Sequence, residues 1–286
     1  MRTGATMGAE IDRAAGRLKS AGVPGPRSEA RLLMGYALGL SRETVFGHVD
    51  RPVTPADAKR FESAVRRRVS REPAARILGC REFWSLPFRV TAATLIPRPE
   101  TETVIEAALK ATGGRERAID ILDLGTGTGC LLLALLSELA NARGLGVDAS
   151  VEALEVAAAN ASALGLSDRA RFRLGDWGKG LRQRFDLIVA NPPYIPEDEI
   201  GGLEPEVARF EPSLALSGGS DGLGCYRALA ADIRRLMAPG ARIVLEIGEG
   251  QGDGVTAILG AEGLEVTGRR ADLSGIPRCL VAEFTG

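Results

Sequence analysis

The sequence predicts an α/β protein in which a mostly parallel β-sheet, with helices on both faces, follows a small all-α domain. From residue 118 onward, apolar runs of strand length alternate with segments of helix length, which is typical of a parallel sheet. Residues 1–75 instead repeat apolar positions at helical spacing, and a β-prone stretch at 76–95 lies between the two regions. We therefore expect a helical domain at 1–75, a β-hairpin linker at 76–95 and an α/β domain at 96–286.

The first 75 residues are expected to form several short helices. Apolar residues such as Ile11 and Leu18 recur at helical spacing, Ser41 is placed as an N-cap, and Pro55 opens a further helix at its first position. This region holds 14 Lys and Arg against 8 Asp and Glu. The positive excess is either a set of solvated helix faces or a docking surface for an acidic partner.

The linker region changes to β-prone residues. Phe83 and Trp84 precede Pro87 and further apolar positions, which favours a short hairpin. The sequence LIPRPETE then places Arg98 between two prolines, directly before a helical segment. We expect Arg98 to lie at the edge of a pocket.

The α/β domain is expected to contain seven strands. They are placed at 119–124, 145–148, 172–174, 185–190, 242–247, 264–267 and 279–284. Helices are expected at 130–139, 151–164, 226–237 and around 255–259, with Pro239-Gly240 turning the chain. No helical pattern separates the last two strands, so we expect them to pair antiparallel as a closing hairpin.

Composition excludes several classes of function. The net charge of −1 and the pI near 6.1 argue against a general nucleic-acid binder. No apolar run approaches the roughly 20 residues of a membrane span, and Glu10 and Asp12 argue against an export signal. Four scattered cysteines and a single histidine, His48, predict a reduced cytoplasmic protein without a metal site.

A glycine-rich turn follows the first strand of the α/β domain. Glycines here allow tight turning and close approach of the backbone to a ligand at a helix N-terminus. The pattern is G-x-G-x-G and differs from the dinucleotide fingerprint, because Cys130 stands where the third glycine of that fingerprint would be. The residues of the turn are Gly125, Thr126, Gly127, Thr128 and Gly129.

Polar and aromatic residues follow the next two strands. Asp148 ends the second strand, where a carboxylate can accept both hydroxyls of a ribose. Asp176 and Trp177 follow the third strand and offer a carboxylate and an aromatic wall for an adenine. Each feature alone also fits a structural role, but three such features at three consecutive strand ends indicate a nucleoside ligand.

The fourth strand stops at Asn191-Pro192-Pro193-Tyr194. Two prolines cannot donate ladder hydrogen bonds and fix φ, so they end the strand in a stiff corner. The corner offers the Asn191 amide, carbonyl acceptors and the Tyr194 ring, which suit a flat NH2 group. A plain strand-to-loop turn is the alternative interpretation of these four residues.

The chain resembles the class I S-adenosylmethionine-dependent methyltransferases, whose seven-stranded sheet has an antiparallel last strand. It is more closely similar to the bacterial HemK-type release factor glutamine methyltransferases. The motifs that carry this resemblance are EPAARILG at 72–79, REFWSLPF at 81–88, LIPRPETE at 95–102, NPPYI at 191–195, EPSLALSGGSDGLG at 211–224 and DLSGIPR at 272–278. They cover nearly the whole chain.

This resemblance implies both substrates of a reaction. S-adenosyl-L-methionine would give its methyl group to the amide nitrogen of the glutamine in the Gly-Gly-Gln loop of release factors, leaving S-adenosyl-L-homocysteine. Asn191, Pro192, Pro193 and Tyr194 would hold the amide, while residues 125–129 with Asp148, Asp176, Trp177 and Asn191 would hold the methyl donor. We expect a monomer that touches neither nucleic acid nor membrane, and we name Arg98 and Glu246 as pocket candidates.

Three other functions compete with this interpretation. A DNA adenine methyltransferase shares the Asn-Pro-Pro-Tyr corner but needs a base-flipping, DNA-facing surface, and residues 76–286 carry 22 basic against 29 acidic residues. A sibling enzyme methylates a glutamine of a ribosomal protein, and the corner does not separate the two protein substrates. A non-catalytic nucleoside-binding scaffold is disfavoured by the joint presence of the glycines, Asp148 and the corner.

Overall fold

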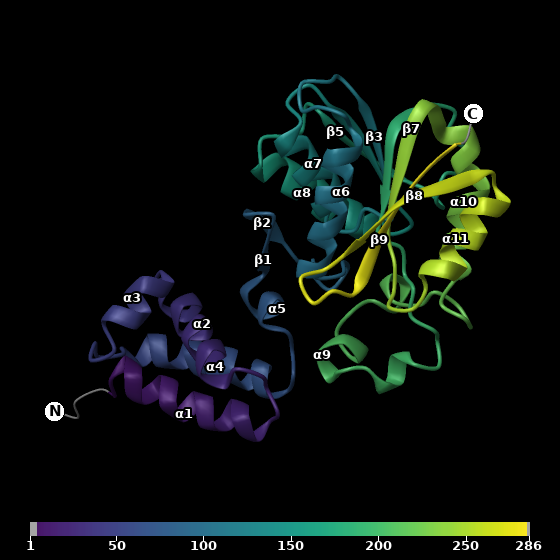
Figure 1. The fold of residues 1–286 in the computed structure, drawn as a ribbon. Coiled ribbons are helices and arrows are strands. Elements are labelled where there is room, and N and C mark those ends of the chain that lie inside the picture. The colour runs from purple at the N-terminus through teal and green to yellow at the C-terminus, as the bar shows by residue number, and fades with distance from the viewer. Residues whose placement is uncertain (1–4, 285–286) are drawn as a thin grey trace. The chain divides into compact units, whose positions relative to one another are not determined.

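The computed structural model describes residues 5–284, which divide into two compact units (Figure 1). The helical unit comprises the residues up to Gly79 together with Glu204–Phe210, and the sheet unit comprises Cys80–Leu203 and the residues from Glu211 onward. The first boundary lies four residues beyond the predicted position at residue 75. Segment Glu204–Phe210 groups with the helices although its sequence lies inside the predicted α/β domain.

Six helices build the described part of the helical unit. They are α1 (Met7–Ser20), α2 (Pro26–Leu38), α3 (Arg42–Gly47), α4 (Pro55–Val69), α5 (Ala74–Leu78) and α9 (Pro205–Ala208). Ser41 caps α3 by accepting the Thr44 N–H, and Pro55 opens α4 after the Thr54 cap, as predicted. Their apolar faces pack together around residues such as Leu33 and Phe61.

Glu206 of α9 is the centre of an ion-pair network within the helical unit. It pairs with Arg68 at 2.8 Å and with Arg71 at 2.5 Å, and Arg68 also pairs with Glu29 at 2.8 Å. Burial opposes the charge of Glu206, but hydrogen bonds from Arg71 and Arg68 lower its pKa. These contacts explain why a segment distant in sequence belongs to this unit.

The sheet unit begins with an antiparallel hairpin, and its main sheet has seven strands. The hairpin is β1 (Cys80–Phe83) and β2 (Leu86–Arg89), with positive φ at Trp84 and Ser85 in its turn. The sheet strands are β3 (Asp120–Leu124), β4 (Arg143–Asp148), β5 (Ala170–Leu174), β6 (Phe185–Ala190), β7 (Met237–Glu246), β8 (Leu264–Ala271) and β9 (Pro277–Phe284). The helices are α6 (Glu102–Ala111), α7 (Cys130–Glu138), α8 (Val151–Ala163), α10 (Gly224–Leu236) and α11 (Gly252–Ala261), with 3₁₀ turns η1 (Pro99–Thr101), η2 (Ile200–Gly202) and η3 (Ser213–Ala215).

The strand order is β5-β4-β3-β6-β7-β9-β8, and the last strand, β9, runs antiparallel to both of its neighbours. The predicted mostly parallel sheet with an antiparallel last strand is confirmed. The predicted turn at Pro239-Gly240 is wrong, because Met237–Glu246 is one strand. Met237 pairs with Phe185 and Arg242 pairs with Leu187, so the residues of β7 between Met237 and Arg242 form a bulge. The positive φ of Gly240 permits the bend.

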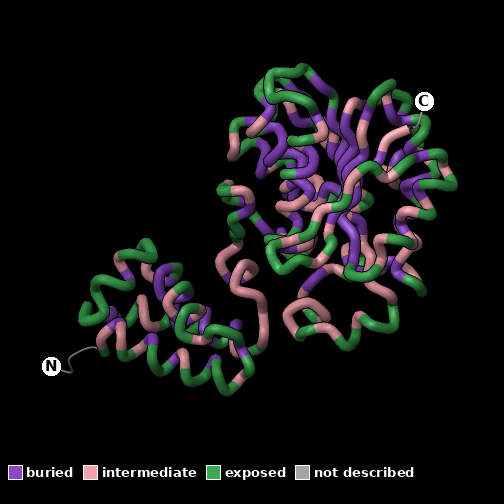
Figure 2. Tube along the Cα trace, in the orientation of Figure 1, coloured by how far each residue is buried: buried purple, intermediate pink, exposed green. Residues whose placement is uncertain are grey.

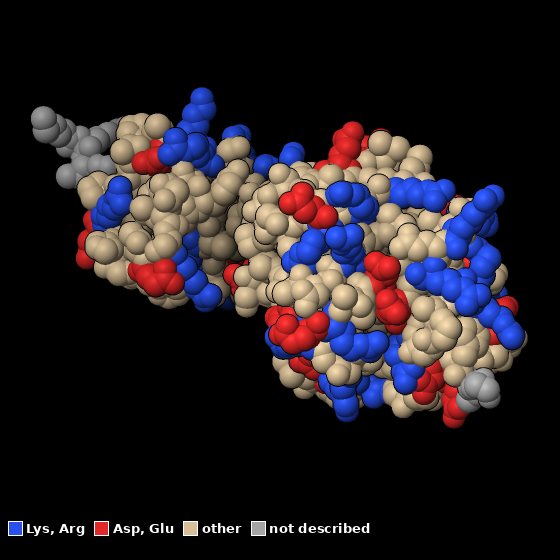
Figure 3. Space-filling view, turned by 90° about the horizontal axis from the view of Figure 1, so that it is seen from above, with Lys and Arg blue, Asp and Glu red and all other residues tan. Residues whose placement is uncertain are grey.

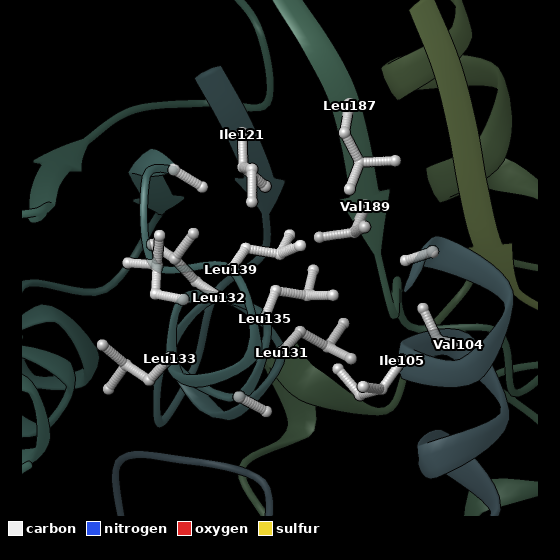
Figure 4. Packing of buried hydrophobic residues seen from close by; sticks show 14 of the residues in the cluster. Val104, Ile105, Ile121, Leu131, Leu132, Leu133, Leu135, Leu139, Leu187 and Val189 are labelled. Carbon is white, nitrogen blue, oxygen red and sulfur yellow. The ribbon is translucent and has the colours of Figure 1, made fainter. Parts of the chain in front are cut away.

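Alternating side chains of the central strands fill two apolar layers, one on each face of the sheet. Ile121 and Leu187 pack with α6 and α7 on one face, as Figure 4 shows. Leu122 and Ile188 face α10 and α11 on the other. In Figure 2 the trace through the centre of the sheet unit is mostly coloured as buried, and this packed centre gives the strand ends a rigid base.

The parallel strands end at one edge of the sheet. Their pairing brings Leu124 beside both Val147 and Ala190, and Ala190 beside Leu245. The chain runs outward from β3 to β5 and then returns to β6, so strand order reverses between β3 and β6. Ligands bind at such switch points in open α/β sheets. No helix of the described residues is both long and apolar enough to cross a membrane.

Candidate functional site

A cavity of about 540 Å³ opens at this edge of the sheet unit. Its size suits a small organic ligand, for which pockets of roughly 300–1,000 Å³ are usual. Of the predicted site residues, the structure gathers ten along its wall: Arg98, Gly125, Thr126, Gly127, Thr128, Asp148, Asp176, Trp177, Asn191 and Pro193. Gly129, Pro192 and Tyr194 are not part of that lining.

The glycine-rich turn wraps around the end of β4. Gly125, Gly127 and Gly129 all adopt positive φ, which L side chains rarely adopt. The Gly125 and Thr126 N–H groups both donate to the Val147 carbonyl, at 2.9 and 3.0 Å. A Cβ on Gly129 would lie 3.1 Å from a Leu133 methyl, so this glycine serves the packing of α7 while the turn before it faces the cavity.

Asp148 joins the turn to the next strand end. Its Oδ2 accepts the Gly127 N–H at 2.8 Å, and its Oδ1 accepts the Ser150 N–H at 3.0 Å. Each carboxylate oxygen retains a lone pair beyond these bonds. The carboxylate is therefore held in place by backbone donors and still offers two acceptors to the cavity.

The wall continues at the end of β5. Trp177 has a positive φ of 49°, and its ring lies close to Gly125, where a Cβ would stand 3.6 Å from the indole. A side chain at position 125 would therefore crowd the aromatic wall. Asp176 is exposed and pairs with Lys179, so it is a well-solvated part of the cavity wall.

Asn191 stands directly after β6 on the cavity wall. Its Nδ2 donates to Thr101 Oγ1 at 3.2 Å. Among the described residues, its Oδ1 has no hydrogen-bond partner. The carboxamide therefore has one end engaged with the protein and an acceptor available for a ligand.

The rest of the corner is braced from behind. Tyr194 donates its hydroxyl to Glu246 Oε1 at 3.3 Å, and its carbonyl accepts from Gln251 Nε2 at 2.8 Å. Burial, and then Glu246, raise the pKa of the Tyr194 hydroxyl. Ile195 exchanges backbone hydrogen bonds with Leu216 and Gly218, which gives the EPSLALSGG motif its place as a support of the corner.

Arg98 and Glu246 occupy different positions. Arg98 lines the cavity and pairs with the buried Glu211 at 2.9 Å. Glu246 does not line the cavity. Its side chain lies behind the wall, where it is 2% exposed and accepts the Tyr194 hydroxyl. Burial raises the pKa of Glu246 to about 7, against the lowering effect of the Thr101 and Tyr194 hydroxyls.

The sequence reasoning missed three supports of this site. Thr101 holds Asn191, and Gln251 holds the Tyr194 carbonyl. Asp123 is 1% exposed and accepts the Thr126 hydroxyl at 2.6 Å, and burial raises its pKa to about 7. An acidic residue inside an apolar strand, directly before the glycine turn, was the available signal for Asp123.

The part of the chain that the structure describes contains no cluster of side chains that could bind a metal ion. No group of three or more His, Cys, Asp or Glu side chains converges there to hold an ion. Cys130 lines the cavity, and burial raises its thiol pKa to about 12, so the thiol is held in its protonated and weakly nucleophilic form.

Profiles of known families match both units. The PrmC N-terminal domain matches residues 11–79, and a methyltransferase domain matches residues 115–251. The solved hMettl16 catalytic domain in complex with MAT2A 3'UTR hairpin 6 has a TM-score of 0.59 and 18% identity. It covers 74% of this chain and 82% of that one, which is a likeness of fold.

Curated relatives match along nearly the whole chain. The release factor glutamine methyltransferase of Rhodospirillum rubrum is 51% identical over 279 residues, which are 96% of this chain and 84% of the relative. The protein of the same name from Bradyrhizobium diazoefficiens is 46% identical over 271 residues, covering 94% of this chain and 91% of the relative.

Proposed function

The chain belongs to the release factor glutamine methyltransferases, and we propose that it methylates the glutamine of the Gly-Gly-Gln motif in peptide chain release factors. S-adenosyl-L-methionine is the methyl donor of this family, and the acceptor is the side-chain amide nitrogen. The observation that carries the proposal is the placement of Asn191, with an available acceptor oxygen, on the same cavity wall as Asp148 and the glycine turn.

The residues of the cavity fit the methyl donor. Asp148 offers two acceptors to the ribose hydroxyls, and Trp177 offers a flat wall to the adenine. The glycine turn allows close approach of the backbone. When bound, S-adenosyl-L-methionine supplies a methyl group already activated by its positively charged sulfur.

Asn191 and Pro192 then orient the acceptor. An amide nitrogen is a poor nucleophile because its lone pair is delocalised into the carbonyl, and it carries two protons. Asn191 Oδ1 and the Pro192 carbonyl each accept a hydrogen bond from one of the two N–H groups, which fixes the amide plane and helps to localise the lone pair. Orientation of this kind contributes several kcal/mol to lowering a barrier.

Proton removal needs no histidine. His48, the only histidine of the chain, belongs to the helical unit. The nitrogen loses its proton after methyl transfer, when it has become acidic, and water accepts that proton. Pro193 and the ring of Tyr194 keep the corner stiff while this occurs.

The helical unit serves to dock the protein substrate. Tyr36 and Phe46 are half exposed on it, and the Arg31 guanidinium lies 4.2 Å from the Phe46 ring centre. Aromatic and arginine side chains of this kind dominate protein interfaces. The positive excess of residues 1–75 suits an acidic partner surface.

We propose that the enzyme acts as a monomer, in the cytoplasm where release factors work. Nucleic acid is not the substrate in this account. On the face shown in Figure 3, acidic and basic side chains are interspersed over the larger body, whereas a DNA-facing surface is dominated by basic groups.

Labelled methyl transfer to three purified substrates tests the proposal. Release factor, a ribosomal protein with a known methylated glutamine, and DNA are each incubated with the enzyme and labelled S-adenosyl-L-methionine. We expect label in the release factor alone, on its Gly-Gly-Gln glutamine. Label only in the ribosomal protein or in the DNA contradicts the proposal.

A further inference from the structure

The Gln251 side chain joins three segments behind the Asn-Pro-Pro-Tyr corner. Gln251 is the N-cap residue of α11, and its carbonyl accepts the Val255 N–H at 3.0 Å. Val255 is fully buried in the apolar layer beneath this helix. The side chain therefore extends from a base that the core of the sheet unit holds in place.

Both ends of the Gln251 carboxamide are engaged. Its Nε2 donates to the Tyr194 carbonyl at 2.8 Å and lies 3.5 Å from the Gly222 carbonyl. Its Oε1 accepts the Gly248 N–H at 3.1 Å, and the Tyr226 hydroxyl lies 3.4 Å from the same oxygen. A backbone N–H only donates and a carbonyl only accepts, so these partners fix which end of the carboxamide faces the corner.

Two glycines make room for this side chain. A Cβ on Gly248 would lie 2.6 Å from Gln251 Oε1 and 3.0 Å from Tyr194 Cδ2. A Cβ on Gly222 would lie 2.6 Å from Gln251 Nε2 and 2.5 Å from the Tyr194 carbonyl oxygen. A larger residue at either position would displace the carboxamide or the carbonyl that it holds. The backbone around Gln251 is thus shaped to this one side chain.

The bond to the Tyr194 carbonyl closes the far end of the corner. At the near end, the Asn191 carboxamide donates to Thr101 Oγ1 at 3.2 Å. Between these two ends, Pro192 and Pro193 each have a fixed φ. With both ends held, the Pro192 carbonyl between them is restricted to a narrow range of directions.

Building on the proposed function, we propose that Gln251 is a positioning residue that holds the corner in the geometry the substrate amide requires. It acts through the Tyr194 carbonyl and is not part of the cavity lining. The residues assigned to the methyl donor follow other strands, β3, β4 and β5. Loss of the Gln251 NH2 group therefore slows methyl transfer without weakening donor binding.

Three single variants and one double variant separate positioning from general packing. Gln251→Met keeps an unbranched side chain of similar length and removes the NH2 donor. Gly248→Ala crowds the same carboxamide from the segment after β7, and Gly248 is not among the glycines with positive φ. The double variant combines these two changes. Gly260→Ala is the matched control, because Gly260 lies in α11 and a Cβ there meets nothing within 4 Å.

The assay measures kcat and KM for glutamine methylation, and calorimetry gives the dissociation constant and the number of sites for S-adenosyl-L-methionine. Rates are expressed per donor-binding site, so unfolded enzyme does not count. We expect kcat of Gln251→Met to fall about 10- to 100-fold, with KM and donor affinity within about threefold of wild type. Gly248→Ala should also lower kcat, and the double variant should be within about threefold of the slower single variant, because both changes act on one contact.

Four results would overturn the inference. They are a Gln251→Met kcat within about threefold of that of Gly260→Ala, a loss of donor affinity as large as the loss of kcat, a raised KM at unchanged kcat, and losses that multiply in the double variant. The wild-type rate can be measured on either glutamine substrate. Transfer to the ribosomal protein instead of the release factor therefore contradicts only the proposed function, and the variant comparison on that substrate still decides the inference.

Discussion

Replacing Asp148 by Asn should weaken binding of the methyl donor much more than it weakens the fold. The carboxylate accepts the Gly127 and Ser150 N–H groups at 2.8 and 3.0 Å and keeps two acceptors for a ribose. A carboxamide replaces one of these oxygens with an NH2 group, which repels the N–H it faces. At least one charge-assisted hydrogen bond to the ligand is lost, worth about 1.5–3 kcal/mol.

That loss corresponds to a dissociation constant for S-adenosyl-L-methionine about 10- to 100-fold larger, measured by calorimetry. Asp186→Asn is the matched control, because Asp186 Oδ2 accepts the Asp120 N–H at 2.9 Å at the opposite end of the strands. Urea unfolding should show a similar small loss of stability in both variants. If Asp148→Asn binds the donor within about twofold of Asp186→Asn, the assignment of Asp148 to the ribose is refuted.

Four further changes test other parts of the account. Trp177→Ala should weaken donor binding by about 1–3 kcal/mol through lost stacking, measured by calorimetry; unchanged binding would remove the indole from the adenine site. Phe46→Ala should raise KM for the release factor about tenfold or more with kcat unchanged, and a normal KM would exclude this docking face. Glu206→Ala removes the carboxylate partner of Arg71 and one of the two carboxylates that pair with Arg68, so it should destabilise the helical unit by up to about 3 kcal/mol in urea, and an unchanged midpoint would contradict the network. Burial raises the pKa of Asp123 in the folded protein to about 7, above its ordinary 3.8, so its contribution to stability is full in acid and is lost as pH rises from about 4 through 7. The free energy of unfolding of Asp123→Asn should therefore exceed that of wild type by up to about 4 kcal/mol at pH 8. A difference that stays constant across pH would contradict this.

Periodicity and strand-end residues predicted most of the fold of the sheet unit. The central strands β3 and β6 were found because both of their faces are buried, which makes them nearly continuous apolar runs. Pro239-Gly240 misled the prediction for β7, since a bulge accommodates both residues within a strand. Segment Glu204–Phe210 was unpredictable for a different reason. Its place depends on the ion pairs of Glu206 with Arg68 and Arg71, and local patterns do not encode pairing between distant residues.

The candidate site likewise contains residues that the sequence predicted and residues that it did not. Residues on the cavity wall follow strand ends directly, so their positions in the sequence indicated their place in space. Thr101 and Gln251 act on Asn191 and Tyr194 from other segments. Thr101 lies in the LIPRPETE motif, but that motif indicated a pocket edge at Arg98 and no partner for Asn191, and Gln251 belongs to none of the motifs used for the prediction. Tyr194 was predicted to hold the substrate amide, and this stays a prediction; the structure shows that its hydroxyl donates to Glu246.

The single-turnover rate of methyl transfer to release factor by Asn191→Ala tests the central role of the corner most directly. The control is Asn141→Ala, an exposed asparagine whose Nδ2 donates to the Glu116 carbonyl. We expect Asn191→Ala to lose transfer by at least about 100-fold, with donor affinity only modestly reduced. A rate near that of Asn141→Ala would contradict the account, because the substrate amide would then be held without Asn191.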